Sequence, residues 1–132
     1  MYFNHSLFEL VRKRVSCRTF SDRPVDASAR SRIEKLLREA SCVDFRFVLA
    51  EKPAAPEGEK IGSYGLVRNA GLFIVSIVRN GADLVELGAV LETIVLAVTD
   101  ADLGCVWLAG TFDKKGFDRD ISRAADEYIP VV

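Results

Sequence analysis

Residues 84–101 read LVELGAVLETIVLAVTDA, and this stretch decides the fold that the sequence predicts. At 3.6 residues per turn, its apolar side chains form one broad arc and a thinner ridge, separated by two narrow polar rows. The ridge consists of Val85, Ala89 and Leu96. Such a helix is buried on two sides, so we expect a sheet against the arc and either another helix or a second subunit against the ridge. Its three carboxylates exclude a membrane-spanning helix.

Short apolar segments on both sides of this helix predict strands. Residues 45–50, FRFVLA, place alternate apolar side chains on one face, as in a half-buried strand. Residues 72–78, LFIVSIV, are apolar almost throughout, as in a strand covered on both faces. Residues 104–109, GCVWLA, predict a third interior strand, and residues 128–132 predict the start of another.

Two further helices have capping signals at their starts. Ser6 and Glu9 have the spacing of a capping box, in which each side chain bonds the backbone of the other residue. Either Asp26 or Ser28 caps a second helix with an apolar stripe. At 132 residues, the chain is expected to form one domain over residues 1–132. The start of the sequence has no charged and apolar leader, which predicts a cytoplasmic protein.

The cysteines and the histidine argue against a metal centre. Cys17, Cys42 and Cys105 are odd in number and widely separated, and we expect buried free thiols. The only histidine is His5, which we place in a frayed terminus. We therefore expect neither a metal site nor a catalytic triad.

Charge is distributed unevenly along the chain. Residues 1–50 contain ten Lys or Arg and six Asp or Glu, which gives +4, whereas residues 51–132 contain eight and thirteen, which gives −5. A nucleic-acid binder usually has a basic excess over the whole domain, with aromatic residues among the cations. The local basic cluster is more suitable for a small anionic ligand than for nucleic acid.

The densest polar signal is the segment RVSCRTF at residues 14–20. In an extended segment Arg14, Ser16 and Arg18 point the same way, so two guanidinium groups and a hydroxyl converge. Arginine offers a planar fork of donors that suits phosphate. The alternative is a helix end followed by a solvated strand face, and spacing alone leaves the two interpretations equal.

The order of these features resembles the FMN-dependent nitroreductase family. A helix, then R-x-S-x-R-x-F, then a turn with Pro24 and Val25 is similar to the opening of that family. The likeness continues through KIGSYG at residues 60–65, the apolar strand, the long helix and LGCVWLAGTF at residues 103–112, and it is closest to a short-chain branch. It implies an α+β, nitroreductase-like fold, with a mixed central β-sheet flanked by helices and a long buried central helix.

Carried over by position, the resemblance places the FMN phosphate at Arg14, with Ser16 and the backbone of Val15 beside it. It places Arg18 at the pyrimidine edge of the flavin, where a cation would stabilise negative charge on the reduced ring. Family members usually carry an Asn and a Lys or Arg at this edge, and here only Ser63 or Tyr64 could replace them. The residues implied to lie against the flavin ring are Leu108, Ala109 and Gly110. No catalytic acid or base is implied.

The implied function is that of an FMN-dependent NAD(P)H oxidoreductase. Hydride would pass through the flavin to an electron-poor small molecule, in a homodimer with neither nucleic acid nor membrane as partner. Family members continue further and end in a basic pair that completes the phosphate site. We therefore expect the chain to lack a C-terminal part or a partner to supply it. The alternative is a non-catalytic nucleotide- or flavin-binding module, or a structural interaction domain, that keeps the fold.

Overall fold

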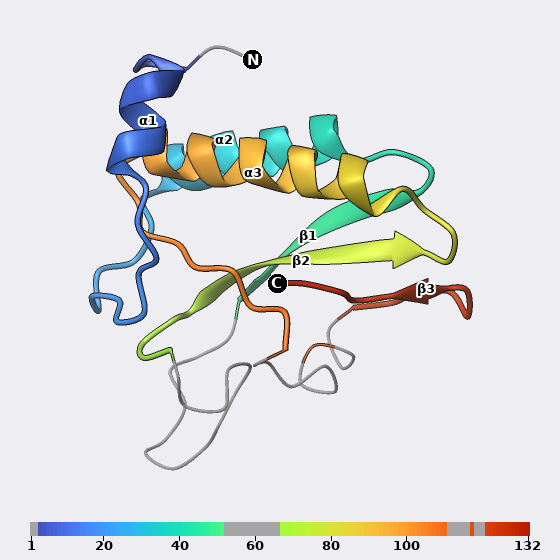
Figure 1. The fold of residues 1–132 in the computed structure, drawn as a ribbon. Helices are drawn as coiled ribbons and strands as arrows, with labels where there is room; N and C mark the ends of the chain where they lie inside the picture. Colours follow the sequence, from blue (N-terminus) through green and yellow to red (C-terminus); the bar gives the residue numbers. More distant parts are fainter. Residues whose placement is uncertain (1–2, 52–66, 111–116, 118–120) are drawn as a thin grey trace.

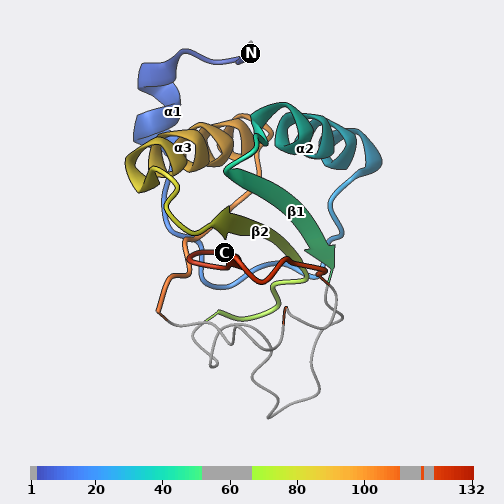
Figure 2. The same cartoon turned by 90° about the vertical axis from the view of Figure 1, so that its right-hand side faces the viewer.

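The computed structural model describes residues 3–51, 67–110, 117 and 121–132. Two helices lie side by side over one face of a three-stranded sheet, and a short N-terminal helix stands at one end of the pair (Figures 1 and 2). The fold is α+β, as predicted, with the long helix beside the sheet.

The helices begin where the capping signals indicate. Their bounds are α1, Leu7–Lys13, α2, Ala27–Ala40, and α3, Leu84–Asp100. The capping box of Ser6 and Glu9 is present at α1. Asp26, and not Ser28, caps α2, because its carboxylate accepts a hydrogen bond from the N–H of Ala29 at 2.9 Å. Among the described residues, no helix has the length and apolar character needed to cross a lipid bilayer.

The two apolar surfaces of α3 have different surroundings. The broad arc faces the main core, where Leu87, Leu91, Ile94 and Val98 are buried with residues of α2 and β1. On the ridge, Leu96 is only 6% exposed, whereas Val85 is 83% exposed. The helix α1 packs against α3. The chain therefore covers Leu96 itself, and a second subunit could contact only the N-terminal end of the ridge.

The sheet has the strand order β1–β2–β3, and both pairings are antiparallel. The strands are β1, Phe45–Glu51, β2, Leu72–Arg79, and β3, Glu127–Tyr128. In the register of β1 and β2, Phe45 lies opposite Val78 and Glu51 opposite Leu72. The only parallel pairings among the described residues are two isolated bridges outside the three strands.

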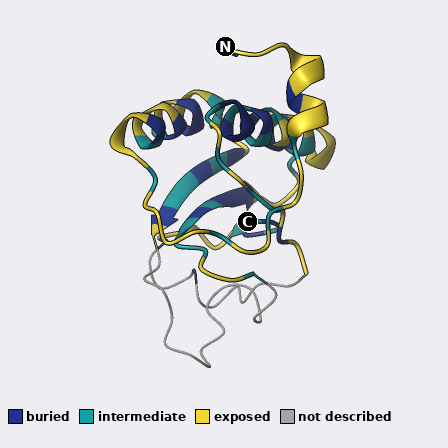
Figure 3. Cartoon of the chain, turned by 90° about the vertical axis from the view of Figure 1, so that its left-hand side faces the viewer, coloured by how far each residue is buried: buried dark blue, intermediate teal, exposed yellow. Residues whose placement is uncertain are grey.

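As predicted, β2 is covered on both faces, and Figure 3 shows that it is buried along most of its length. One face packs under α2 and α3 with Phe45, Phe47 and Val78 in its core. The other face forms a second cluster that contains Phe73, Val75, Ile77, Leu108, Phe117, Ile121 and Ile129. In that cluster the rings of Phe73 and Phe117 meet edge to face at 5.2 Å. The sheet is therefore the middle layer of the molecule.

The predicted interior strand at residues 104–109 is wrong. Cys105 forms a one-residue parallel bridge with Ser16, whereas Leu108 exchanges backbone hydrogen bonds with Val132 at 2.8 and 2.9 Å. A strand needs successive residues paired with one neighbour. Here the pairing partner changes within three residues, so the segment is extended but joins no ladder. Val106 and Leu108 pack in the cluster beneath the sheet, Cys105 packs against the main core, and Trp107 is exposed.

The N-terminal segment is held in place, so the predicted fraying of His5 is wrong. The carboxylate of Asp100, at the end of α3, accepts hydrogen bonds from the backbone N–H groups of Asn4 at 2.8 Å and His5 at 3.0 Å. The Nδ1 of His5 lies 2.8 Å from the same carboxylate. The start of the chain is therefore tied to the far end of the central helix.

Candidate functional site

The candidate site begins where α1 ends. The N–H of Arg14 still bonds the carbonyl of Leu10 at 2.9 Å, but the backbone of Arg14 is extended. Two isolated parallel bridges hold the following segment, one between Ser16 and Cys105 and one between Thr19 and Arg68. The short extended piece predicted for residues 15–20 is therefore present, although it belongs to no named strand.

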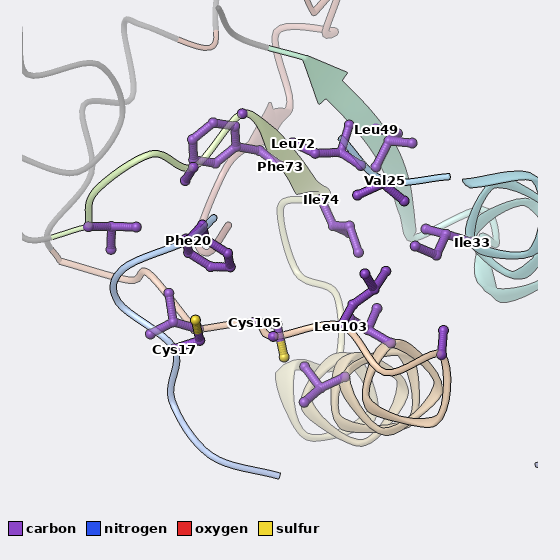
Figure 4. Close-up of a pocket in the computed structure, with 18 of the residues that line it drawn as sticks. Cys17, Phe20, Val25, Ile33, Leu49, Leu72, Phe73, Ile74, Leu103 and Cys105 are labelled. Carbon is purple, nitrogen blue, oxygen red and sulfur yellow. The ribbon is translucent and has the colours of Figure 1, made fainter. Parts of the chain in front are cut away.

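The two faces of this extended segment have different surroundings. Cys17 and Thr19 line a cavity of about 1280 Å³, together with apolar residues of β1, β2, α2 and α3. Figure 4 shows Cys17 and Phe20 on one side of this cavity and Ile33 and Leu49 on another. Arg14, Ser16 and Arg18 do not line it. The alternation of an extended chain thus separates the polar face from the cavity.

On the polar face, Arg14 and Ser16 meet. Nη1 of Arg14 lies 3.4 Å from Oγ of Ser16, to which it donates a long hydrogen bond. Nε of Arg14 is buried and has no hydrogen-bond partner within the described part of the chain. The side chain of Arg18 is exposed and forms no hydrogen bond or ion pair with the described residues. The predicted convergence is therefore present for Arg14 and Ser16, whereas Arg18 stands apart.

The neighbouring cations Arg12 and Lys13 interact with other side chains. The guanidinium of Arg12 lies over the ring of Phe8, 4.3 Å from its centroid. Lys13 forms an ion pair with Asp102, and its hydrogen bond and charge lower the pKa of that carboxyl. Within the part of the chain that the structure describes, Arg14 and Arg18 are the cations of the 12–18 cluster that form no ion pair and no cation–π contact.

The segment predicted to lie against a flavin ring is divided between core and surface. Leu108 is buried and bonded to Val132, whereas Ala109 and Gly110 are exposed. A Cβ at Gly110 would meet no atom of the described residues within 4 Å, so these residues leave open space against this backbone. A planar ligand could approach it closely. Val15 is exposed, and Ser63 and Tyr64 lie outside the described residues.

The cysteines differ in burial, contrary to the expectation that all three are buried. Cys42 is exposed because it follows the end of α2, whereas Cys17 and Cys105 are half-buried. All three are free thiols, as predicted. The described residues contain no group of three or more His, Cys, Asp or Glu that could hold a metal ion.

Sequence analysis did not assign two residues that lie beside the site. The bridges place Cys105 beside Ser16 and the exposed cation Arg68 beside Thr19. No local pattern marks either residue, because each reaches the site through a pairing between distant parts of the chain. Only the order of motifs in the resemblance, which places GCVWLA near the first segment, could have suggested Cys105.

A protein-family model described as "Putative TM nitroreductase" matches residues 6–132. The chain belongs to this nitroreductase family. The predicted resemblance is therefore confirmed over nearly the whole sequence. A search of curated proteins found no match.

Solved structures of nitroreductases share the fold. A nitroreductase family protein from Clostridium difficile 630 has a TM-score of 0.73 at 19% identity, over 96% of this chain and 81% of that one. A "putative nitroreductase in complex with fmn" from Desulfovibrio desulfuricans has 0.69 at 21% identity, over 97% and 83%. A "Putative NADH dehydrogenase/NAD(P)H nitroreductase" from Bacteroides thetaiotaomicron VPI-5482 has 0.66 at 17% identity, over 94% and 81%. At these identities the likeness shows a nitroreductase-like fold.

Proposed function

We propose that this protein is an FMN-dependent oxidoreductase that uses NAD(P)H as reductant and an electron-poor small molecule as acceptor. The observation that carries the proposal is the buried Nε of Arg14, which has no partner in the described structure and lies in a guanidinium that contacts Ser16. A buried donor without an acceptor costs about 1–3 kcal/mol. A phosphate oxygen would satisfy that donor and would add a charge-assisted hydrogen bond.

The residues present fit FMN. Arg14, the hydroxyl of Ser16 and the backbone of Val15 would hold the phosphate. Arg18 would lie at the ring edge, where its positive charge would stabilise negative charge on the reduced ring. When bound, FMN supplies the hydride chemistry, so the chain itself needs no acid or base.

The remaining proposed contacts lie along the ring. Ala109 and Gly110 offer exposed backbone with open space against it, and Leu108 anchors that segment through its bonds to Val132. Ser63 or Tyr64 would supply the polar contact at the ring edge, a proposal that rests on the family resemblance. These residues would bind and orient the ring, and orientation can supply a large part of the rate of hydride transfer.

The names of the structural relatives support the choice of cofactor and reductant. One relative is in complex with FMN, and another is named for NAD(P)H. We extend both to this chain as part of the proposal. The acceptor would be a quinone or a nitroaromatic compound, because such rings accept electrons from a reduced flavin.

We also propose that the protein works as a homodimer, or with a partner that completes the fold. Large apolar side chains are exposed on α1 and at the start of α3, namely Leu7, Phe8, Val11, Leu84 and Val85. These side chains form two separate patches, because α1 lies at the C-terminal end of α3 and Leu84 and Val85 lie at its N-terminal end (Figure 1). Exposed apolar patches are typical of interaction sites. A second copy would cover one of these patches, and light scattering on the reduced protein measures the mass of the assembly.

Spectroscopy tests the cofactor, and turnover tests the reaction. The purified protein should bind FMN more tightly than riboflavin, which lacks the phosphate, by about tenfold or more in a fluorescence titration. The FMN complex should oxidise NADH or NADPH under anaerobic conditions when a quinone is supplied. Binding without oxidation would indicate the non-catalytic flavin-binding module, and equal affinity for FMN and riboflavin would exclude the phosphate site at Arg14.

A further inference from the structure

Cys105 lies beside the segment that carries Arg14 and Ser16, and it also lines the cavity. Ser16 and Cys105 are the two partners of a parallel bridge, and the N–H of Cys17 donates to the carbonyl of Cys105 at 3.0 Å. The partners of a bridge project their side chains to the same face, and residues two apart on an extended chain share a face. The thiol of Cys105 is therefore on the same side as the guanidinium of Arg14.

The electrostatics of the thiol indicate the same neighbour. Burial raises the pKa of Cys105, while the positive charge of Arg14 acts in the opposite direction. The carboxylate of Glu92 adds to the rise. In Figure 4, Cys105 lies on a segment that runs beside the one bearing Cys17.

We propose that Cys105 is a positioning residue of the anion site, where its thiol packs beside the Arg14 guanidinium and holds it next to Ser16. This inference rests on the proposed phosphate site. An anion bound at Arg14 would offset the guanidinium charge and would make the thiolate of Cys105 less stable. By linkage, negative charge placed on the sulfur must weaken anion binding by the same factor.

Alkylation of the cysteines measures the first half of this coupling. Iodoacetamide reacts with the thiolate, and mass spectrometry of peptides reports each cysteine separately. Saturating FMN or inorganic phosphate should slow the reaction of Cys105 by about tenfold below its pKa, because thiolate becomes scarcer. The exposed Cys42 is the internal control and should react at an unchanged rate. Equal rates at Cys105 with and without both anions would overturn the inference.

The pH profile separates electrostatic coupling from simple shielding. In Arg14→Gln without any ligand, the alkylation profile of Cys105 should move to higher pH, because the stabilising cation is gone. Lys13→Gln is the matched control, since Lys13 is paired with Asp102 and should leave the profile unchanged. If the Arg14→Gln profile coincides with that of the parent, Cys105 is not coupled to Arg14. This experiment needs no flavin. Its outcome therefore tests the coupling of Cys105 to Arg14 separately from the proposal that the protein binds FMN.

Chemical modification tests the reverse direction. In a Cys17→Ser, Cys42→Ser variant, iodoacetate adds a carboxylate to Cys105, whereas iodoacetamide adds a neutral group of nearly equal size. The carboxylate form should bind phosphate and FMN about tenfold more weakly than the amide form, because it occupies Arg14. Equal affinities of the two forms would show that charge at the sulfur does not reach the anion site, and would overturn the proposal.

Discussion

Two buried polar groups near the ends of neighbouring helices have opposite environments. The Asp100 carboxylate ends α3, is 1% exposed, and accepts from the N–H groups of Asn4 and His5 and from His5 Nδ1. Arg32 lies 3.6 Å from it. The Arg14 guanidinium follows α1, donates one long hydrogen bond to Ser16 and lies beside the thiol of Cys105, and its buried Nε has no partner in the described chain.

The difference separates a structural group from a candidate binding group. A carboxylate at a helix C-terminus is disfavoured by the helix dipole, so Asp100 is retained only because several donors surround it. Those donors join the N-terminal segment to α2 and α3. Among the described residues, Arg14 joins no elements with comparable strength, and its buried Nε has no acceptor there. Stability and ligand affinity should therefore respond to different substitutions.

The largest expected effect is on stability. Asp100→Ala should lower the free energy of unfolding by about 3 kcal/mol, because it removes a buried carboxylate that accepts hydrogen bonds from the N–H groups of Asn4 and His5 and from His5 Nδ1. Urea denaturation followed by circular dichroism measures the loss. Asp102→Asn is the matched control, since the carboxylate is exposed and Asn tolerates the φ of 60° at this position, and it should change stability little. A loss as large in the control would remove the contrast between the two carboxylates.

The next effect is on affinity. Arg14→Gln should weaken FMN binding by about 2 kcal/mol, or about thirtyfold, because the charge-assisted bonds to phosphate are lost. Stability should hardly change, because Nε has no partner to lose among the residues that the structure describes. Arg12→Gln, which removes a cation stacked on Phe8, should leave affinity unchanged. Fluorescence titration measures the binding, and an unaltered Kd for Arg14→Gln would contradict the assignment.

A smaller effect is expected at His5. His5→Ala should destabilise the chain by about 1 kcal/mol, because the backbone donors of Asn4 and His5 remain while one hydrogen bond to a charged group is lost. The side chain of His5 is also half-exposed, which weakens its contribution. Thermal unfolding of the variant beside Asp100→Ala would rank the two. A larger loss at His5 than at Asp100 would show that the imidazole, and not the carboxylate, is central.

The smallest effect is the dependence of stability on pH. Burial alone would raise the pKa of Asp100, but the hydrogen bonds from Asn4 and His5 outweigh it, and the pKa is lowered from 3.8. The unfolded chain therefore binds the proton first. The stabilisation is complete above the ordinary pKa and is lost as the pH falls through the folded-state pKa. The difference in unfolding free energy between the parent and Asp100→Asn should shrink over that interval, and a constant difference would contradict this origin.

The predictable part of the fold is the part encoded locally. Helical periodicity and caps gave α3 to within one residue and the start of α1, and alternation gave β1. The segment 104–109 has the composition of a strand, but its pairing depends on where Ser16 and Val132 lie. Periodicity contains no information on that partner, so the strand was predicted where only an extended segment exists.

The site follows the same division. Arg14 and Ser16 were identified because they are two residues apart in an extended segment, and the structure brings them together. Asp100 and its donors are separated by as many as 96 positions in the sequence. Nothing in the sequence near Asp100 indicates that these donors lie beside it in the fold. Cys105 likewise reaches the site through a bridge to a distant residue. Residue spacing identifies side chains that converge on one segment, but it does not identify side chains that come together from distant parts of the sequence.

The exposed Cys42 has a practical consequence for how copies of this chain associate. Its thiol lies just after α2, away from the apolar surface of α1, so air oxidation can join two molecules through a sulfur–sulfur bond. Such a covalent pair would have twice the mass of the monomer and would resemble an assembly by size alone. A reductant breaks this disulfide, and replacing Cys42 with serine prevents it from forming. Either change leaves any association through the helices intact.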